Sequence, residues 1–139
     1  MAPYGAAATN RNNMSRKMVK NVFIVDDDDM MAMALEDYLT RNTLHEVHIF
    51  TTGEDCIKNL RLQPDIIILD YNLNSVNKEA ANGMAILEAI KKLNRNIPVI
   101  LFSSQDAYSV AIQSINKGAT QYVIKDEKAF ENIAAICNS

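Results

Sequence analysis

Short apolar runs alternate with longer stretches of helical periodicity from Val19 to the end of the chain. This alternation is typical of βα units arranged around a parallel sheet. Three runs are continuously apolar, as expected of strands that helices cover on both faces, whereas residues 45–50 alternate and indicate an edge strand. The predicted strands are residues 21–25, 46–50, 65–69, 98–102 and 121–124.

The stretches between and after these runs predict five helices. Two of them carry apolar stripes, with side chains at i, i+3, i+4 and i+7. The stripes are Met31, Ala34, Leu35 and Tyr38, and then Phe130, Ile133, Ala134 and Cys137. The pairs Thr51/Glu54 and Ser103/Asp106 match helix starts, and Gly118 matches the end of the fourth helix. Right-handed crossovers would place helices on both faces, so the prediction is an α/β protein with a doubly wound, five-stranded parallel sheet of the flavodoxin-like (βα)5 type.

With 139 residues, the chain has the size of one globular domain. The first 18 residues lack the apolar segment of a secretory signal, so residues 1–18 are predicted to be a disordered leader and residues 19–139 the folded domain. The apolar runs are shorter than the ~20 residues that span a bilayer, so no membrane contact is expected. The net charge of −3 provides no basic surface, which argues against direct nucleic-acid binding.

The two cysteines, Cys56 and Cys137, lie far apart within apolar helical patterns and lack the spacing of a metal site. They are predicted to be buried thiols in a reducing compartment, which favours a cytoplasmic protein. A disulfide or a zinc site is the less favoured alternative.

Polar side chains follow four of the predicted strands. Asp26 and Asp27 follow the first strand, Asp70 the third, Ser103 the fourth and Lys125 the fifth. The carboxyl ends of parallel strands share one edge of the sheet, where ligands bind in such folds, so these side chains are expected to meet. Clustered carboxylates repel one another, and a hard divalent cation with oxygen ligands relieves the repulsion, which predicts Mg²⁺.

These side chains together suit phosphoryl transfer. A magnesium ion neutralises phosphoryl oxygens, so an ionised carboxylate can attack an anionic phosphorus centre. The Lys125 ammonium can pair with the acyl phosphate, and the Ser103 hydroxyl can donate to a phosphoryl oxygen. The set therefore predicts an Asp nucleophile. Taken singly, Asp70 suits a turn, Lys125 a solvated surface and Ser103 a helix cap, while Asp28 and Asp29 are assigned to the first turn of a helix.

Four segments, in this order, resemble the four sequence blocks of response-regulator receiver domains. They are VFIVDDD at residues 22–28, IIILD at 66–70, VILFSS at 99–104 and GATQYVIK at 118–125. The resemblance implies a phosphoacceptor signalling domain of a two-component system, and not an enzyme that acts on a separate substrate. It implies that Asp70 accepts a phosphoryl group from a phosphohistidine on a sensor histidine kinase or a phosphotransfer protein.

The resemblance also implies a magnesium site. Asp27, Asp70 and the backbone carbonyl of Asn72 would ligate the cation, and Asp26 would act directly or through water. Asn72 and Gln105 stand two positions beyond the acceptor and the Ser103 hydroxyl, where side chains tend to tune hydrolysis of the acyl phosphate.

The switch residues follow from the same resemblance. Ser103 takes the position of the switch hydroxyl, Lys125 that of the invariant lysine and Tyr122 that of the switch aromatic. Phosphorylation would draw Ser103 towards the phosphoryl group and turn Tyr122 inward. This population shift would reshape the face made by the fourth helix, the fifth strand and the fifth helix, through which a homodimer could also form.

Two departures from the family pattern stand out. Asp126 takes the place of the usual proline after the lysine, and a cis Lys125–Asp126 bond without proline would cost about 3 kcal/mol, so a trans bond is expected. The loop between Asp70 and Gly83 is longer than usual and polar. It could cover the site or contact a partner, although a tolerated surface insertion is the favoured interpretation.

Two other functions compete with this interpretation. A haloacid-dehalogenase-like phosphatase would use Asp26 as nucleophile and Asp28 as acid, although Met30 does not suit that pattern. A pseudo-receiver would keep the fold and act only as a docking module. The sequence leaves the signal, the kinase and the output open.

Overall fold

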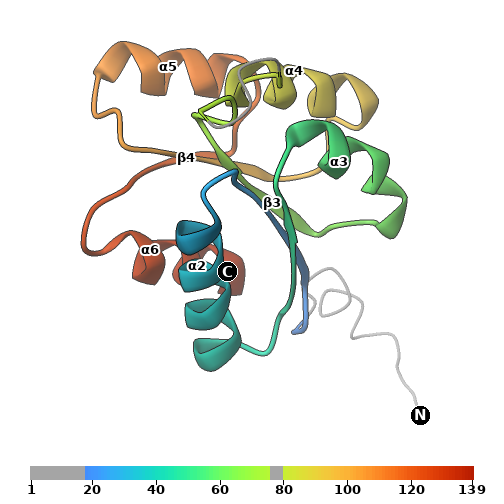
Figure 1. Cartoon of the computed structure of the whole chain (residues 1–139), viewed down its shortest axis with the longest axis vertical. Helices are drawn as coiled ribbons and strands as arrows, with labels where there is room; N and C mark the ends of the chain where they lie inside the picture. Colours follow the sequence, from blue (N-terminus) through green and yellow to red (C-terminus); the bar gives the residue numbers. More distant parts are fainter. Residues whose placement is uncertain (1–17, 76–79) are drawn as a thin grey trace, which may run out of the picture.

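The computed structural model describes residues 18–75 and 80–139, and within these ranges five parallel strands form one sheet (Figure 1). The strands are β1 (Asn21–Val25), β2 (Glu46–Phe50), β3 (Ile66–Asp70), β4 (Val99–Ser103) and β5 (Gln121–Ile124). Their order in the sheet is β2-β1-β3-β4-β5, so β2 is an edge strand, as the alternation of residues 45–50 predicted. The predicted leader, apart from Met18, lies outside the described residues.

Helices cover both faces of this sheet (Figure 1). One face carries α2 (Asp29–Asn42) and α6 (Ala129–Asn138), and the other carries α3 (Gly53–Lys58), α4 (Gly83–Leu93) and α5 (Tyr108–Asn116). A short 3-10 helix, Leu60–Leu62, follows α3. No helix in the described ranges has the length and apolar character needed to cross a membrane. The predicted doubly wound, flavodoxin-like α/β fold is therefore confirmed.

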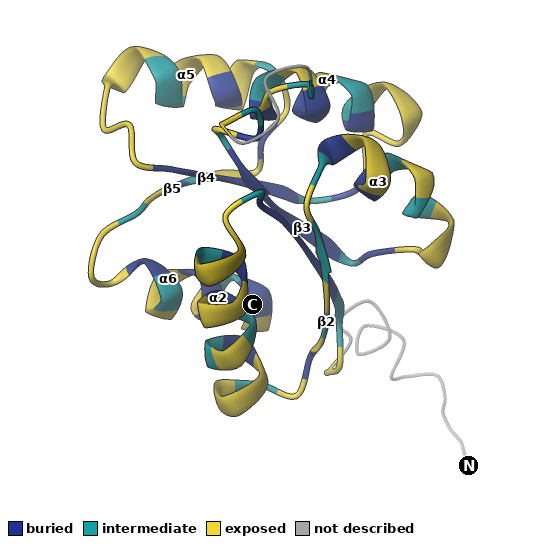
Figure 2. Ribbon diagram, in the orientation of Figure 1, coloured by how far each residue is buried: buried dark blue, intermediate teal, exposed yellow. Residues whose placement is uncertain are grey.

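The strands divide their side chains between two cores. In β1, Val22 and Ile24 pack towards α2 and α6, whereas Phe23 and Val25 pack towards α3 and α4. Every residue of β3 and β4 is buried (Figure 2), because helices lie on both sides of these central strands. The direction of the strand order changes between β1 and β3, and the ends of these two strands are the usual place for a ligand in such a fold.

Two predicted strands were placed one residue too early. The structure has β3 at Ile66–Asp70 and β4 at Val99–Ser103, whereas the predictions were residues 65–69 and 98–102. Sheet pairing continues past the apolar runs, because Asp70 pairs with Phe102 and Ser103 pairs with Ile124. The two polar residues are thus held by the sheet itself.

Both predicted helix starts were wrong in detail. Thr52, and not Thr51, caps α3, since its side chain accepts the Asp55 amide N–H at 3.1 Å. Ser103 starts no helix, because it ends β4 and α5 begins only at Tyr108. Gly118 was predicted correctly, for it follows the C-terminus of α5 with a φ of 109° that favours glycine.

The apolar stripe of α2 was predicted only in part. Leu35 is buried, while Ala34 is exposed, and the buried face is completed by Ala32 and Leu39. The face of α2 that packs on the sheet is therefore centred on Ala32, Leu35 and Leu39, and Met31 and Tyr38 are partly buried beside it. The stripe of α6 is confirmed, since Ile133, Ala134 and Cys137 are buried and Phe130 packs against the same core.

The two cysteines are free and buried, as predicted. Burial raises the pKa of the Cys56 thiol from near 9 to about 12, and burial raises the pKa of Cys137 to about 11. We therefore expect neither thiol to react with iodoacetamide in the native protein at pH 8, since the thiolate is the nucleophile. Both should react in concentrated urea, and rapid native labelling of both would contradict their burial.

The same shifts give a pH dependence of stability. Above about pH 9 the unfolded chain releases the thiol protons, whereas the folded chain keeps them until about pH 11 to 12. The thiols' contribution to stability is thus complete below pH 9 and decreases above it. Urea unfolding between pH 8 and pH 10, compared with a Cys56→Ser and Cys137→Ser double variant, measures this contribution.

Candidate functional site

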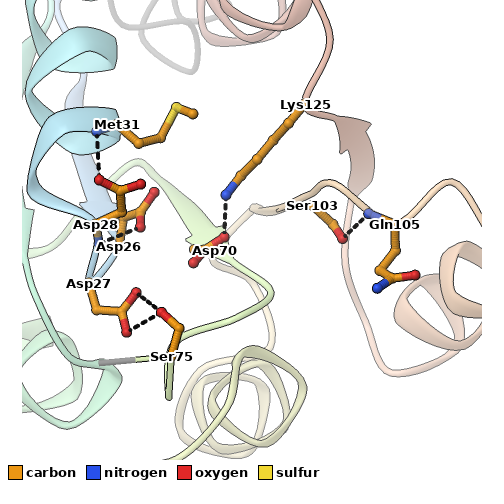
Figure 3. Close-up of polar contacts among 9 residues, drawn as sticks. All are labelled: Asp26, Asp27, Asp28, Met31, Asp70, Ser75, Ser103, Gln105 and Lys125. Atoms are coloured by element: carbon orange, nitrogen blue, oxygen red, sulfur yellow. Dashed lines mark hydrogen bonds and ion pairs between the residues drawn. The ribbon is translucent and has the colours of Figure 1, made fainter. Parts of the chain in front are cut away.

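Four strands deliver polar side chains to the carboxyl edge of the sheet, as predicted (Figure 3). Asp26 directly follows β1, and its amide N–H donates to the Phe50 carbonyl at 3.0 Å. Lys125 directly follows β5, and its amide N–H donates to the Ser103 carbonyl at 2.8 Å. Because these residues continue the sheet ladder, their side chains project from fixed backbone positions next to Asp70, the last residue of β3.

Three carboxylates lie together at this edge. Asp26, Asp27 and Asp70 each offer an oxygen, and these oxygens lie within 4.8 Å of one another. Asp26 is 2% exposed and Asp70 4% exposed, so water screens two of the three charges poorly. Burial raises the pKa of Asp26 to about 7, and repulsion by Asp70 adds to the rise. Lys125 pairs with Asp70, so the three carboxylates and this lysine together keep an excess of negative charge when all three acids are ionised.

The donor set fits Mg²⁺. All three ligand groups offer carboxylate oxygens, which suit a hard divalent cation and not a soft metal that prefers thiolates. A cation at this point would offset the repulsion between the carboxylates and stabilise the ionised form of Asp26, whose pKa is raised mainly by burial. Asn72, whose carbonyl was also predicted as a ligand, lies two residues beyond Asp70 and is exposed.

Lys125 holds one oxygen of Asp70. Its ammonium group lies 2.7 Å from Asp70 Oδ1 (Figure 3). The same group lies 5.1 Å from the centre of the Phe102 ring. The lysine is thus fixed by an ion pair and a cation–π contact at once. Among the described residues, none hydrogen-bonds to Asp70 Oδ2, so this oxygen can serve as a nucleophile or as a metal ligand.

Ser103 and Tyr122 are joined through one residue. The Ser103 hydroxyl oxygen accepts the Gln105 amide N–H at 2.9 Å, and the Tyr122 hydroxyl donates to the Gln105 carbonyl at 2.5 Å. Ser103 is 1% exposed and Tyr122 half-buried, whereas the Gln105 side chain is exposed. The backbone of Gln105 therefore connects the edge of the site to β5.

The neighbouring acids Asp28 and Asp29 lie at the start of α2, as predicted, although Asp28 is the N-cap and not a first-turn residue. Asp28 caps α2, because its carboxylate accepts the amide N–H groups of Met30 and Met31, and Asp29 lies in the first turn. Asp28 is therefore engaged with the helix and does not belong to the three-carboxylate cluster. Between Lys125 and Asp126 the peptide bond is trans, as expected without proline.

Ser75, which lies in the long loop after β3, was not among the predicted site residues. Its hydroxyl donates to both oxygens of Asp27, at 3.0 and 2.9 Å (Figure 3). Part of this loop, residues 76–79, lies outside the described residues, so the predicted surface insertion is described only at its two ends. The one hint in the sequence was Leu73, an apolar residue in a polar loop, which is fully buried.

Residues 22–137 match the profile of a family described as "Response regulator receiver domain". The chain is 28% identical over 109 residues to chemotaxis protein CheY of Thermotoga maritima, which covers 78% of this chain and 87% of that protein. It is 32% identical over 114 residues to a protein-glutamate methylesterase/protein-glutamine glutaminase of Clostridium acetobutylicum. That match covers 79% of this chain but only 32% of the methylesterase.

Solved structures give the same result. A BeF3-activated DrrB receiver domain superposes with a TM-score of 0.72 at 25% identity, covering 86% of this chain and 94% of that one. The receiver domain of a Francisella response regulator superposes with a TM-score of 0.74 at 21% identity, covering 86% and 93% of the two chains, which supports the fold.

Proposed function

This chain belongs to the response regulator receiver domain family, and we propose that it accepts a phosphoryl group on Asp70 and changes its surface in response. The observation that supports Asp70 best is its position. It is buried at the end of a central strand, paired through one oxygen with Lys125, and next to two further carboxylates. The Asp–Lys pair leaves its second oxygen for the reaction.

The transfer itself is a displacement at phosphorus. An Asp70 oxygen forms a bond to phosphorus, while the bond from phosphorus to the donor breaks and its electron pair leaves with the donor. The donor is a phosphohistidine on a sensor histidine kinase or a phosphotransfer protein, or acetyl phosphate in the test tube. Mg²⁺ bound by Asp26, Asp27, Asp70 and the Asn72 carbonyl would neutralise the phosphoryl oxygens.

Lys125 and Ser103 then stabilise the product. The Lys125 ammonium, already 2.7 Å from Asp70, neutralises charge on the acyl phosphate, and the Ser103 hydroxyl proton is available to donate to a phosphoryl oxygen. Movement of Ser103 would reach Tyr122 through the Gln105 backbone. The proposed output is a population shift on the face formed by α5, β5 and α6.

That face carries apolar side chains suited to a partner. Tyr108 is 80% exposed, and Ile112 and Ile124 are also exposed. We propose this face as the contact for a second copy of the chain or for a target protein.

Mapping of the phosphoryl group tests the function. Incubation with acetyl phosphate and Mg²⁺ should add one phosphoryl group, and proteolysis should recover it on the peptide that contains Asp70. Recovery on Asp26 would instead support a haloacid-dehalogenase-like phosphatase. Failure to form a Mg²⁺-dependent beryllofluoride adduct would support a pseudo-receiver.

The side-chain amides of Asn72 and Gln105 are expected to shorten the lifetime of the acyl phosphate. Asn72 and Gln105 lie where they could orient an attacking water, and both side chains are exposed. We expect an Asn72→Leu and Gln105→Leu double variant to hold the phosphoryl group several-fold longer than the wild type. Decay of the labelled protein after removal of acetyl phosphate measures this lifetime, and an unchanged half-life would remove the amides from the mechanism.

A further inference from the structure

The long loop after β3 returns to the acidic cluster through Ser75. Ser75 and Asp27 are 48 positions apart in the sequence, yet the serine hydroxyl donates to both oxygens of the aspartate (Figure 3). The two distances, 3.0 and 2.9 Å, are nearly equal, so the hydroxyl oxygen lies about midway between the two carboxylate oxygens and faces both of them. A cation that binds both oxygens would occupy this same position in front of the carboxylate.

Two anchors hold the described parts of this loop. Leu73 is fully buried in the core beneath α3 and α4, two positions before Ser75. Near the other end of the loop, the Ala81 amide N–H donates to Glu54 Oε2 at 3.1 Å. Leu73 therefore anchors the backbone two positions before Ser75, whose own side chain is exposed.

A hydroxyl and a magnesium ion make different demands on a carboxylate. The serine donates one proton, which the two Asp27 oxygens share. Mg²⁺ requires bonds of about 2.0–2.1 Å and near-octahedral geometry, so the place that it takes beside an Asp27 oxygen cannot also hold the serine hydroxyl. The Ser75 hydroxyl and a magnesium ion therefore cannot both bind the same side of the Asp27 carboxylate in their preferred geometry.

We propose that Ser75 is a positioning residue that competes with the cation for Asp27. In the cation-free protein its hydroxyl holds the carboxylate, and binding of Mg²⁺ requires Ser75 to release at least one oxygen. Cation binding is thereby coupled to the conformation of residues 71–75. This inference rests on the proposed function, because it takes Asp27 as a metal ligand.

Titration with MgCl₂ at constant ionic strength and without a phosphoryl donor tests the competition. We expect Ser75→Ala to bind Mg²⁺ about fivefold more tightly than the wild type, the factor that corresponds to one lost hydrogen bond. Ser75→Thr keeps the hydroxyl and should bind as the wild type does. Ser109→Ala, a serine on the exposed surface of α5, is the control for loss of a hydroxyl elsewhere.

Amide NMR spectra recorded during the same titration report the coupling. In the wild type, Mg²⁺ should shift the amide signals of Leu73, Asn74 and Ser75, whereas in Ser75→Ala the residues 73 and 74 should shift little. Equal or weaker binding by Ser75→Ala would overturn the competition. If the wild type itself binds no Mg²⁺ and Asp27→Asn changes nothing, the metal site of the proposed function fails, which is a distinct result.

Discussion

We expect an Asp70→Asn variant to accept no phosphoryl group from acetyl phosphate, whereas the wild type should become labelled in the presence of Mg²⁺. The amide carries no negative charge and is a far weaker nucleophile than a carboxylate, so the loss should be complete within detection. Intact-protein mass spectrometry after incubation with acetyl phosphate measures the labelled fraction.

Asp29→Asn is the matched control for this variant. Asp29 is an exposed acid in the first turn of α2, close in sequence to the acidic cluster but not a member of it. Its replacement removes one negative charge and should leave labelling unchanged. Labelling of Asp70→Asn at the wild-type rate would refute Asp70 as the acceptor, and a similar loss in Asp29→Asn would point to net charge as the cause.

A Gly83→Ala variant should be both unstable and slow to accept the phosphoryl group. Gly83 begins α4, and a Cβ atom there would lie 2.3 Å from the Asp70 carbonyl oxygen and 2.8 Å from Tyr71 Cα. Both neighbours are backbone atoms at the end of β3 and cannot rotate away, so the helix or the strand end must move. We expect a loss of about 3 kcal/mol in the free energy of unfolding.

Urea unfolding and the labelling rate per folded molecule measure the two effects. Gly118→Ala is the control, because its positive φ of 109° makes alanine costly by about 1–3 kcal/mol. The contact that its Cβ would make is with the flexible Lys91 side chain, and not with the site. It should therefore lose stability without a change in labelling rate, and wild-type labelling by Gly83→Ala would show that α4 does not set the position of Asp70.

The sequence predicted the parts of this molecule that depend on local pattern. Continuous apolar runs identified the central strands, and the residues that follow them identified the acidic cluster, since strand direction alone brings these residues to one edge. The ends of β3 and β4 were missed by one residue because sheet pairing includes the polar Asp70 and Ser103.

Contacts between distant segments could not be predicted in this way. The hydrogen bond between Ser75 and Asp27 joins residues 48 positions apart and depends on the path of the loop, of which Leu73 is a buried anchor. The close approach of Gly83 to the Asp70 backbone likewise depends on the packing of α4 against β3. The family pattern located Gly83 at the end of the loop but not its contact with the Asp70 backbone, and Ser75 belongs to no motif.

Gln105 makes two hydrogen bonds through its main chain and leaves its side chain exposed. Its amide N–H donates to the Ser103 hydroxyl oxygen, and its carbonyl accepts a hydrogen bond from the Tyr122 hydroxyl. Main-chain atoms of Gln105 therefore link Ser103 to Tyr122. A change of side chain at this position leaves both main-chain bonds possible. Under the proposed function, a substitution of this side chain would change the lifetime of the acyl phosphate and leave the main-chain link between Ser103 and Tyr122 in place, so the duration of the signal and its transmission could evolve separately.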